Sequence, residues 1–126
     1  MTRSEALLIA GKTISDHDRW CQREYATTRL GISCQPRARG AWRFSAYGVM
    51  YHVYRVNLDD FNRSGLDQVA VTSALLDLCA SHLFRATLSQ VNDELGHAET
   101  LEVFRRAIRQ QRATEAHERE KYRGAA

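Results

Sequence analysis

Two pairs of metal-binding residue types stand at helical spacing. His17 and Cys21 are four residues apart, and Cys79 and His82 are three apart, so each pair would share one face of a helix. Together the pairs could form a tetrahedral zinc site. Neither belongs to a standard zinc-binding motif, however, and the second lies in a strongly apolar stretch, where Cys is usually a small core residue. We therefore predict no metal site and no cofactor.

Cys21 is also the candidate for a reactive thiol. Arg19 and Arg23 flank it and would lower the pKa of the thiol if their side chains converged on it. A thiol nucleophile also needs a base held beside it, and His17 could reach only if one helix ran through both residues. The alternative is a half-buried Cys beside Trp20, and we favour that interpretation.

Two pairs of neighbouring carboxylates could serve general acid–base chemistry, Asp59 with Asp60 and Asp93 with Glu94. Adjacent residues on a loop face a common site only if the loop folds for it. Helix caps and turns explain both pairs more simply. The sequence also contains no Walker loop and no G-x-G-x-x-G, H-E-x-x-H or G-x-S-x-G motif. These observations favour a protein that is not an enzyme.

Nucleic-acid binding is the strongest alternative chemistry. Arg37, Arg39 and Arg43 lie beside Trp42 and Phe44, and nucleic acids need clustered cations and, for single strands, exposed aromatic rings. Three further arginines line one side of the expected last helix: Arg105, Arg109 and Arg112. The net charge of +3 is mildly basic. Because five glutamates dilute the last helix, a solvated charged face is the interpretation that we favour.

The elements that must position these residues are expected to be mainly α-helical. The 126 residues fit a single domain, residues 1–126, and 44% hydrophobic with 26% charged residues is ordinary for a globular protein. One Pro and seven Gly leave few turn signals. Apolar residues at helical intervals predict a compact bundle of about four helices, over residues 4–16, 41–56, 66–83 and 97–119.

The connecting segments are less regular. Residues 31–40 and 57–65 are predicted loops, because they are rich in turn-forming residues. Residues 87–96 interrupt the helical pattern and are predicted as an extended piece and a turn. Over 41–56, the β-branched and aromatic residues leave a strand open as an alternative to the helix.

The end of the chain differs from the rest. No large aliphatic residue follows Ile108. A helix there would be held mainly by intrinsic propensity and by charge pairs. We therefore predict that residues 110–126 form a solvent-exposed, projecting helical extension or tail.

The three cysteines are odd in number and widely spaced, whereas secreted disulfide scaffolds carry even, denser sets. The apolar run ALLIA near the N-terminus is too short for a signal peptide or a membrane span. These features predict a reduced, cytoplasmic protein that does not associate with membranes.

Three segments carry a resemblance to a family of small bacterial and phage proteins of unknown function. DRWCQREYATTRLG resembles that family's W-(C/T)-Q segment, RFSAYGVM resembles its central C-A-x-G-A-L helix, and VNDELGHAETLEVFRRAI resembles its closing N-D-x-x-G … E-V-L-x-x-F-x-x-A-I motif. Order and spacing agree over residues 5–109. The resemblance implies a compact, mainly helical cytoplasmic domain, often carried on phage-related or mobile DNA, and it supplies no activity.

The resemblance also separates residues that pack in the fold from residues that could form a polar surface. The Cys position of the first motif accepts Thr in the family, which a nucleophile or zinc ligand would not allow, so Trp20 and Tyr25 are interpreted as packing anchors. Ser45 stands where the family often has Cys, which argues against a thiol role there. If a shared polar surface exists, its candidates are Gln22, Asn92, Asp93 and His97.

We therefore expect a small non-enzymatic protein that binds another macromolecule, in the first place a protein, as an inhibitor or modulator of phage or mobile-element origin. The alternatives are a nucleic-acid-binding accessory protein that uses the six arginines, and an enzyme with a cleft among the four polar candidates. A homo-oligomer stays open. A second face of the 41–56 helix offers interface candidates if they prove exposed: Tyr47, Met50, Tyr51 and Tyr54.

Overall fold

Four long helices form the body of the protein, and a small antiparallel sheet is attached to one side of it. The computed structural model describes residues 1–124. In chain order the elements are α1 (Arg3–Ser15), the 3₁₀ turn η1 (His17–Arg19), β1 (Ala26–Thr28), β2 (Ser33–Cys34), β3 (Ala41–Phe44), α2 (Ala46–Asn57), α3 (Arg63–Phe84), α4 (Leu88–Gln90), the π-helical turn η2 (Val91–Leu95) and α5 (His97–Gly124). The predicted mainly helical fold class is confirmed.

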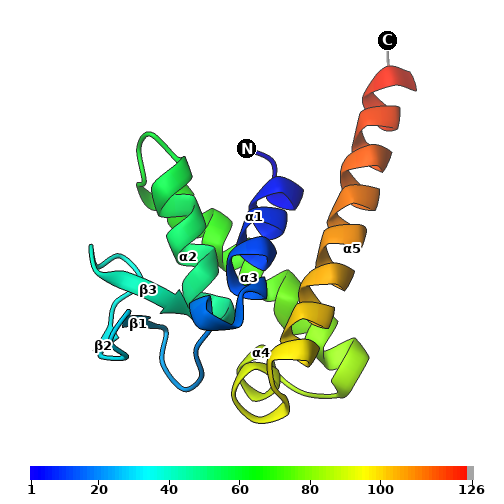
Figure 1. Cartoon of the computed structure of the whole chain (residues 1–126). Helices are drawn as coiled ribbons and strands as arrows, with labels where there is room; N and C mark the ends of the chain where they lie inside the picture. The colour runs from blue at the N-terminus through cyan, green and yellow to red at the C-terminus, as the bar shows by residue number, and fades with distance from the viewer. Residues whose placement is uncertain (125–126) are drawn as a thin grey trace.

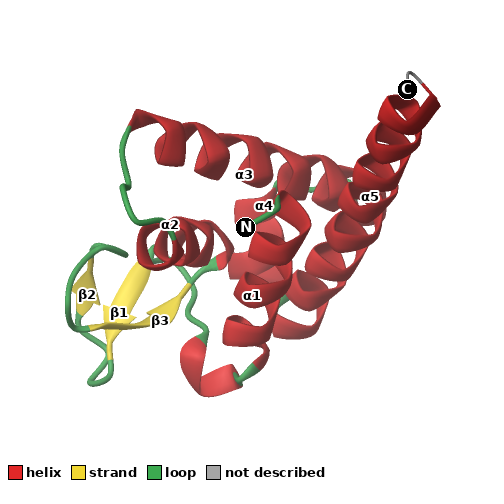
Figure 2. Ribbon diagram, turned by 90° about the horizontal axis from the view of Figure 1, so that it is seen from above, coloured by secondary structure: helices red, strands yellow, loops and turns green. Residues whose placement is uncertain are grey.

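Helix α1 contacts both α2 and α5 and lies between them (Figure 1 and Figure 2). It starts with a capping box, in which the Thr2 side chain accepts from the Glu5 backbone N–H and the Glu5 side chain accepts from the Thr2 N–H. Leu7 and Ile14 are fully buried, and burial of such a side chain contributes roughly 1.5–3 kcal/mol. The apolar side of α1 is therefore a central part of the core.

The sheet has the strand order β2-β1-β3 and is antiparallel throughout. Ala26 of β1 pairs with Cys34 on one side and with Phe44 on the other, and the register shifts between Thr27 and Thr28. Phe44 is fully buried, so it joins the sheet to the helical core. In both ribbon views the sheet and α5 lie on opposite sides of the molecule (Figure 1 and Figure 2).

The helix predicted over residues 41–56 is wrong in its first part, where β3 replaces it. Ser45 separates the two elements, because its backbone is extended and its side chain accepts a hydrogen bond from the Gly48 N–H, which caps α2. The strand that was left open thus holds for residues 41–44, and the predicted helix holds for the rest of the segment. The predicted loop over 31–40 also contains the short strand β2.

The segment 87–96 is helical rather than extended, so that prediction is also wrong. Thr87 and Gln90 form a reciprocal capping box that starts α4, and η2 follows directly. Gly96 then ends the segment with a φ of 122°, a conformation that favours glycine. The sequence carries the T-x-x-Q spacing of a capping box at these positions.

Helix α5 projects from the body at its C-terminal end (Figure 1), which confirms the predicted projecting helix. Of the predicted extension 110–126, residues 125–126 lie outside the described residues. The Glu115 carboxylate holds the first part of the extension against α1, because it accepts hydrogen bonds from the Ser4 backbone N–H at 3.1 Å and the Ser4 hydroxyl at 2.6 Å. From 117 to 123 the side chains are exposed.

Within residues 1–124, no single helix combines the length and apolar character needed to cross a membrane. Helix α3 meets that standard only together with Leu88–Leu95, and those two segments are bent by 68° relative to each other. One side of α3 is buried in the core through Leu76, Cys79 and Ala80.

Candidate functional site

Asn92 is the centre of a buried polar junction. Its side-chain carbonyl oxygen accepts hydrogen bonds from the Trp20 indole N–H at 2.9 Å and from the Ala46 backbone N–H at 3.0 Å. Its amide nitrogen donates to the Cys21 carbonyl at 3.0 Å and to an Asp93 carboxylate oxygen at 2.9 Å. Only 2% of Asn92 is exposed. One side chain therefore joins three segments, each of which carries part of the family resemblance.

The other predicted polar residues surround Asn92 and are bonded to the backbone. The Gln22 amide donates to the carbonyls of Asn92 at 3.1 Å and Asp93 at 3.3 Å. The Asp93 carboxylate accepts the Arg23 N–H at 2.8 Å, and Arg23 has a positive φ of 64° that this contact helps to hold. We call this group, centred on Asn92 with Trp20, Gln22 and Asp93, the Asn92 junction.

His97 lies next to the junction and joins it to α1. Its Nε2 is 2.6 Å from the Ile14 carbonyl oxygen, and its ring lies 4.8 Å from the Trp20 ring and 5.1 Å from the His17 ring, measured between centroids. The structure thus brings all four polar candidates together. Each of them bonds to the chain itself through at least one polar atom, and these bonds hold segments in place.

Cys21 and Cys79 do not have the surroundings of a nucleophile. Burial, and after it the negative charges of Glu24 and Asp93, raise the pKa of the Cys21 thiol to about 11. Burial also raises the pKa of Cys79, which lies in the core. His17 packs against aromatic rings. Among residues 1–124, no three His, Cys, Asp or Glu side chains gather as a metal site would need.

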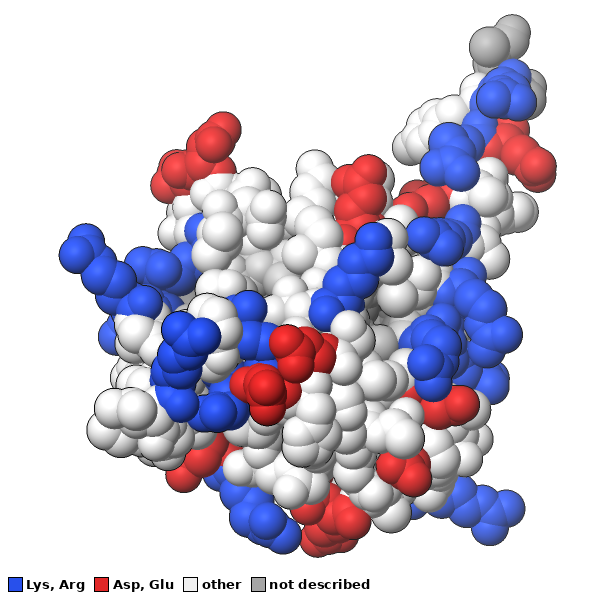
Figure 3. Space-filling model, viewed as in Figure 1, with Lys and Arg blue, Asp and Glu red and all other residues white. Residues whose placement is uncertain are grey.

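The six arginines fall into two separate groups. Arg37 and Arg39 lie near the sheet, whereas Arg105, Arg109 and Arg112 belong to α5 on the opposite side. Figure 3 likewise shows cationic side chains around the sheet and along α5. A single six-arginine surface, as the nucleic-acid alternative assumed, is therefore not formed.

The aromatic residues near the sheet are also engaged within the fold. Guanidinium groups of Arg19 and Arg29 lie 3.9 Å and 4.5 Å from the centre of the Trp42 ring, and Phe44 is buried and stacked on His52. The Arg43 guanidinium donates to the carbonyl of Arg29 at 2.9 Å. Arg43, Trp42 and Phe44 are therefore engaged within the fold, whereas Arg37 and Arg39 are exposed.

An apolar groove of about 290 Å³ lies where the sheet meets α2 and α3. Its lining residues are Tyr25, Pro36, Tyr47, Gly48, Tyr51, Val69 and Ser73, and we call it the tyrosine groove. Gly48 allows α2 to lie against the backbone of Tyr25, because a Cβ at position 48 would lie 1.8 Å from the Tyr25 carbonyl oxygen. Tyr25 is 66% exposed.

The predicted interface candidates divide between this groove and the core. Tyr47 and Tyr51 line the groove and are half-buried, and Phe61 supports the Tyr51 ring at 5.1 Å between centroids. Met50 and Tyr54 are buried, so the prediction is wrong for these two. They occupy the side of α2 that contacts the other helices, while Tyr47 and Tyr51 lie one helical turn apart on its edge. Tyr25, Pro36 and Val69 were missed because they come from other elements.

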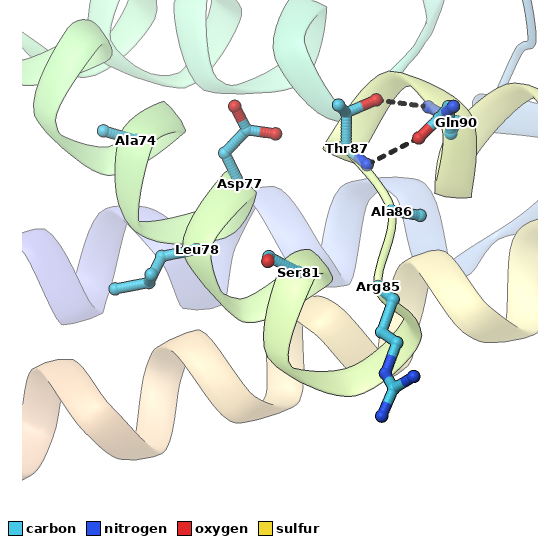
Figure 4. A pocket seen from close by; sticks show the side chains of 8 residues that line it. All are labelled: Ala74, Asp77, Leu78, Ser81, Arg85, Ala86, Thr87 and Gln90. Atoms are coloured by element: carbon cyan, nitrogen blue, oxygen red, sulfur yellow. Dashed lines mark hydrogen bonds between the residues drawn. The ribbon is translucent and has the colours of Figure 1, made fainter.

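A second, open hollow of about 500 Å³ lies between α3 and α4 (Figure 4). Asp77 is the one carboxylate among its eight lining residues, and one of its oxygens accepts the Leu88 N–H at 2.7 Å. Thr87 and Gln90 bond to each other. Asp77, Thr87 and Gln90 of this hollow therefore help to start α4.

The chain belongs to a family of unknown function, DUF6197, whose model matches residues 1–110. This confirms the expected membership of such a family. Comparison with curated proteins and with solved structures found no match. The matched region includes the Asn92 junction and the tyrosine groove and ends within α5.

Proposed function

We propose that this is a small, non-enzymatic, cytoplasmic protein that acts by binding another protein, and that the tyrosine groove is its binding surface. The observation that carries the proposal is the groove's lining of three tyrosines, Pro36 and Val69. Tyrosine supplies a large contact area with little loss of conformational entropy and is enriched at the energetic centres of protein interfaces.

The surroundings of the groove support an uncharged, apolar segment of the partner as its occupant. No charged residue belongs to the lining, so the groove offers no positive charge to a phosphate or a carboxylate. Elsewhere on the sheet, the turn between β1 and β2 carries two aliphatic side chains that are largely exposed, Leu30 at 88% and Ile32 at 63%. Exposed apolar side chains on one small element are typical of a surface that a partner covers.

The competing functions lack a comparable site. The two arginine groups lie on opposite sides of the molecule, and the four polar candidates bond to their own chain. The resemblance implies a phage or mobile-element origin. We therefore also propose that the partner is a host protein, which is inhibited or modulated by the binding.

The test is affinity purification from the host lysate after nuclease treatment, with quantitative mass spectrometry. Three proteins are compared: wild type, the groove variant Tyr25→Ala/Tyr51→Ala, and Tyr122→Ala. Tyr122 is a matched control, because it is an exposed tyrosine on α5. We expect one stoichiometric protein with wild type and with Tyr122→Ala, and its loss with the groove variant.

Recovery of the same proteins by the groove variant would overturn the assignment of the groove. Proteins that disappear with nuclease would instead favour the nucleic-acid alternative, whose affinity must also fall steeply with salt. Circular dichroism and urea unfolding of each variant show whether it is folded.

A further inference from the structure

A second groove runs between α1 and α5, away from the tyrosine groove. Three contiguous hollows form it and share Leu8, and the two larger ones have volumes of about 460 and 520 Å³. Both ribbon views show α1 and α5 side by side (Figure 1 and Figure 2). The groove follows α5 from Leu101 to Arg119, which are 18 positions apart and thus separated by about 27 Å of helix axis.

The floor of this groove is apolar. Leu8 of α1 is half-buried, and it lies with Ile108 in both of the hollows that follow the middle of α5. Phe104 lies beneath the narrow end, where Gly11 faces it on α1, and only 1% of it is exposed. The apolar surface that is open between the two helices is therefore mainly that of the half-buried Leu8 and Leu101.

The rim of the groove carries unneutralised positive charge. Lys12, Arg109 and Arg112 line it, and none of the three forms a salt bridge within residues 1–124. Figure 3 shows the cationic side chains gathered along α5.

The acidic residues of the same groove are already engaged. Glu5 accepts from the Thr2 N–H at 2.7 Å, Glu102 pairs with Arg105 at 3.6 Å, and Glu115 is bonded to Ser4. The cations at positions 12, 109 and 112 therefore remain available to an outside anion.

We propose that the α1–α5 groove binds an acidic amphipathic helix of a partner protein. A helix with an aliphatic stripe would fill the apolar floor, and carboxylates on both flanks of the stripe would meet the cations of the rim. A partner helix of about 18 residues matches the length of the groove. A nucleic acid fits less well, because its backbone has no apolar surface for the floor.

The proposal is independent of the tyrosine groove, and a direct binding measurement tests it. The probe is a fluorescein-labelled peptide of about 18 residues, with leucine at helical i, i+3, i+4 and i+7 positions, glutamate on both flanks and alanine elsewhere. Fluorescence anisotropy gives its affinity for wild type, for Arg109→Ala/Arg112→Ala and for Leu8→Ala. We expect affinity to fall roughly tenfold or more in both variants and to weaken with salt for wild type.

Two controls make the measurement specific. Arg37→Ala/Arg39→Ala removes the same charge near the sheet and is expected to bind the peptide like wild type. A scrambled peptide of the same composition, whose leucines share no helix face, is expected to bind at least about tenfold more weakly.

Equal binding of the two peptides, equal loss in the control variant, or no binding of the amphipathic peptide would each overturn the proposal. So would a DNA duplex that binds more tightly than the peptide and depends on Arg109 and Arg112. Failure of this proposal would leave the test of the tyrosine groove unaffected, because that test uses different variants and a different ligand.

Discussion

The Asn92 junction and the tyrosine groove differ in what their side chains are free to do. At the junction, Asn92 makes four hydrogen bonds within the protein and is almost fully buried. In the groove, Tyr25 is largely exposed and Tyr51 presents its ring beside an open apolar space. Polar residue types thus stabilise the fold here, while aromatic ones are left available for binding.

This contrast matters because polar residues that belong to a family motif are candidates for a catalytic site. Asn92, Gln22 and Asp93 each form hydrogen bonds with backbone groups of their own chain, as residues that hold segments in place do. Substitutions at the two regions should therefore have different consequences, for stability at the junction and for binding at the groove.

The largest effect is expected for Asn92→Ala. The substitution removes four hydrogen bonds and leaves the buried Trp20 indole N–H and Ala46 N–H without their acceptor. We expect the free energy of unfolding to fall by roughly 3–5 kcal/mol, since each unsatisfied buried group costs about 1–3 kcal/mol. Urea unfolding followed by tryptophan fluorescence measures it. Asn57→Ala is the control, because Asn57 is exposed, and a similar loss in both variants would contradict the role of the junction.

Two glycine substitutions should have opposite signs. Gly48→Ala places a Cβ against the Tyr25 carbonyl oxygen, which forces apart α2 and the chain that enters β1. We expect a loss of roughly 1–3 kcal/mol in unfolding free energy.

Gly11→Ala is the matched comparison in α1. Its Cβ would meet the Phe104 side chain at an ordinary 3.6 Å, and alanine favours helix over glycine by about 0.8–1.0 kcal/mol. We expect this variant to be stabilised by up to about that amount. Thermal and urea unfolding measure the stability of both variants. Destabilisation of both would contradict the expectation that position 11 has room for a Cβ and position 48 does not.

A smaller effect is expected from pH at the contact between α1 and α5. Burial alone would raise the pKa of Glu115, but hydrogen bonds from Ser4 and Gln111 outweigh it and lower the pKa below its ordinary value of 4.5. The contact therefore stabilises the fold above pH 4.5 and is lost as the pH falls through the lower folded-state value. Because Glu115 is partly exposed, we expect less than about 1 kcal/mol.

Urea midpoints of wild type and Glu115→Gln at pH 7 and pH 3 measure this term. The stability difference between the two proteins should shrink at the lower pH. A difference that is unchanged or grows there would contradict the assigned direction of the pKa shift.

The smallest effect on stability is expected in the groove. Tyr25→Ala should change the unfolding free energy by no more than about 0.5 kcal/mol, because most of this side chain is exposed. A much larger loss in urea unfolding would mean that Tyr25 acts in packing, as the sequence first suggested.

The sequence predicted the elements whose signal is periodic and long. Helices α1, α3 and α5 begin and end within a few residues of the expected positions. The errors at 41–44 and 87–96 have local causes, since a single capping side chain, Ser45 or Thr87, decides where those helices begin.

The site was predictable in part, because the family resemblance indicated its polar residues. The four polar candidates do meet, although Gln22 and Asn92 are far apart in the chain. Which backbone carbonyls and amides they bond to could not be derived from residue types. The tyrosine groove could be predicted only in part. Tyr47 and Tyr51 share one helix, whereas Tyr25, Pro36 and Val69 are brought to the groove by the tertiary fold.

Hydroxyl-radical footprinting of the protein in complex with its purified partner tests the assignment of the binding surface most directly. We expect oxidation of Tyr25 and Tyr51 to fall strongly in the complex, while Tyr122, exposed on α5, is oxidised as in the free protein. Unchanged oxidation of Tyr25 and Tyr51, with protection appearing elsewhere, would contradict a binding role for the tyrosine groove.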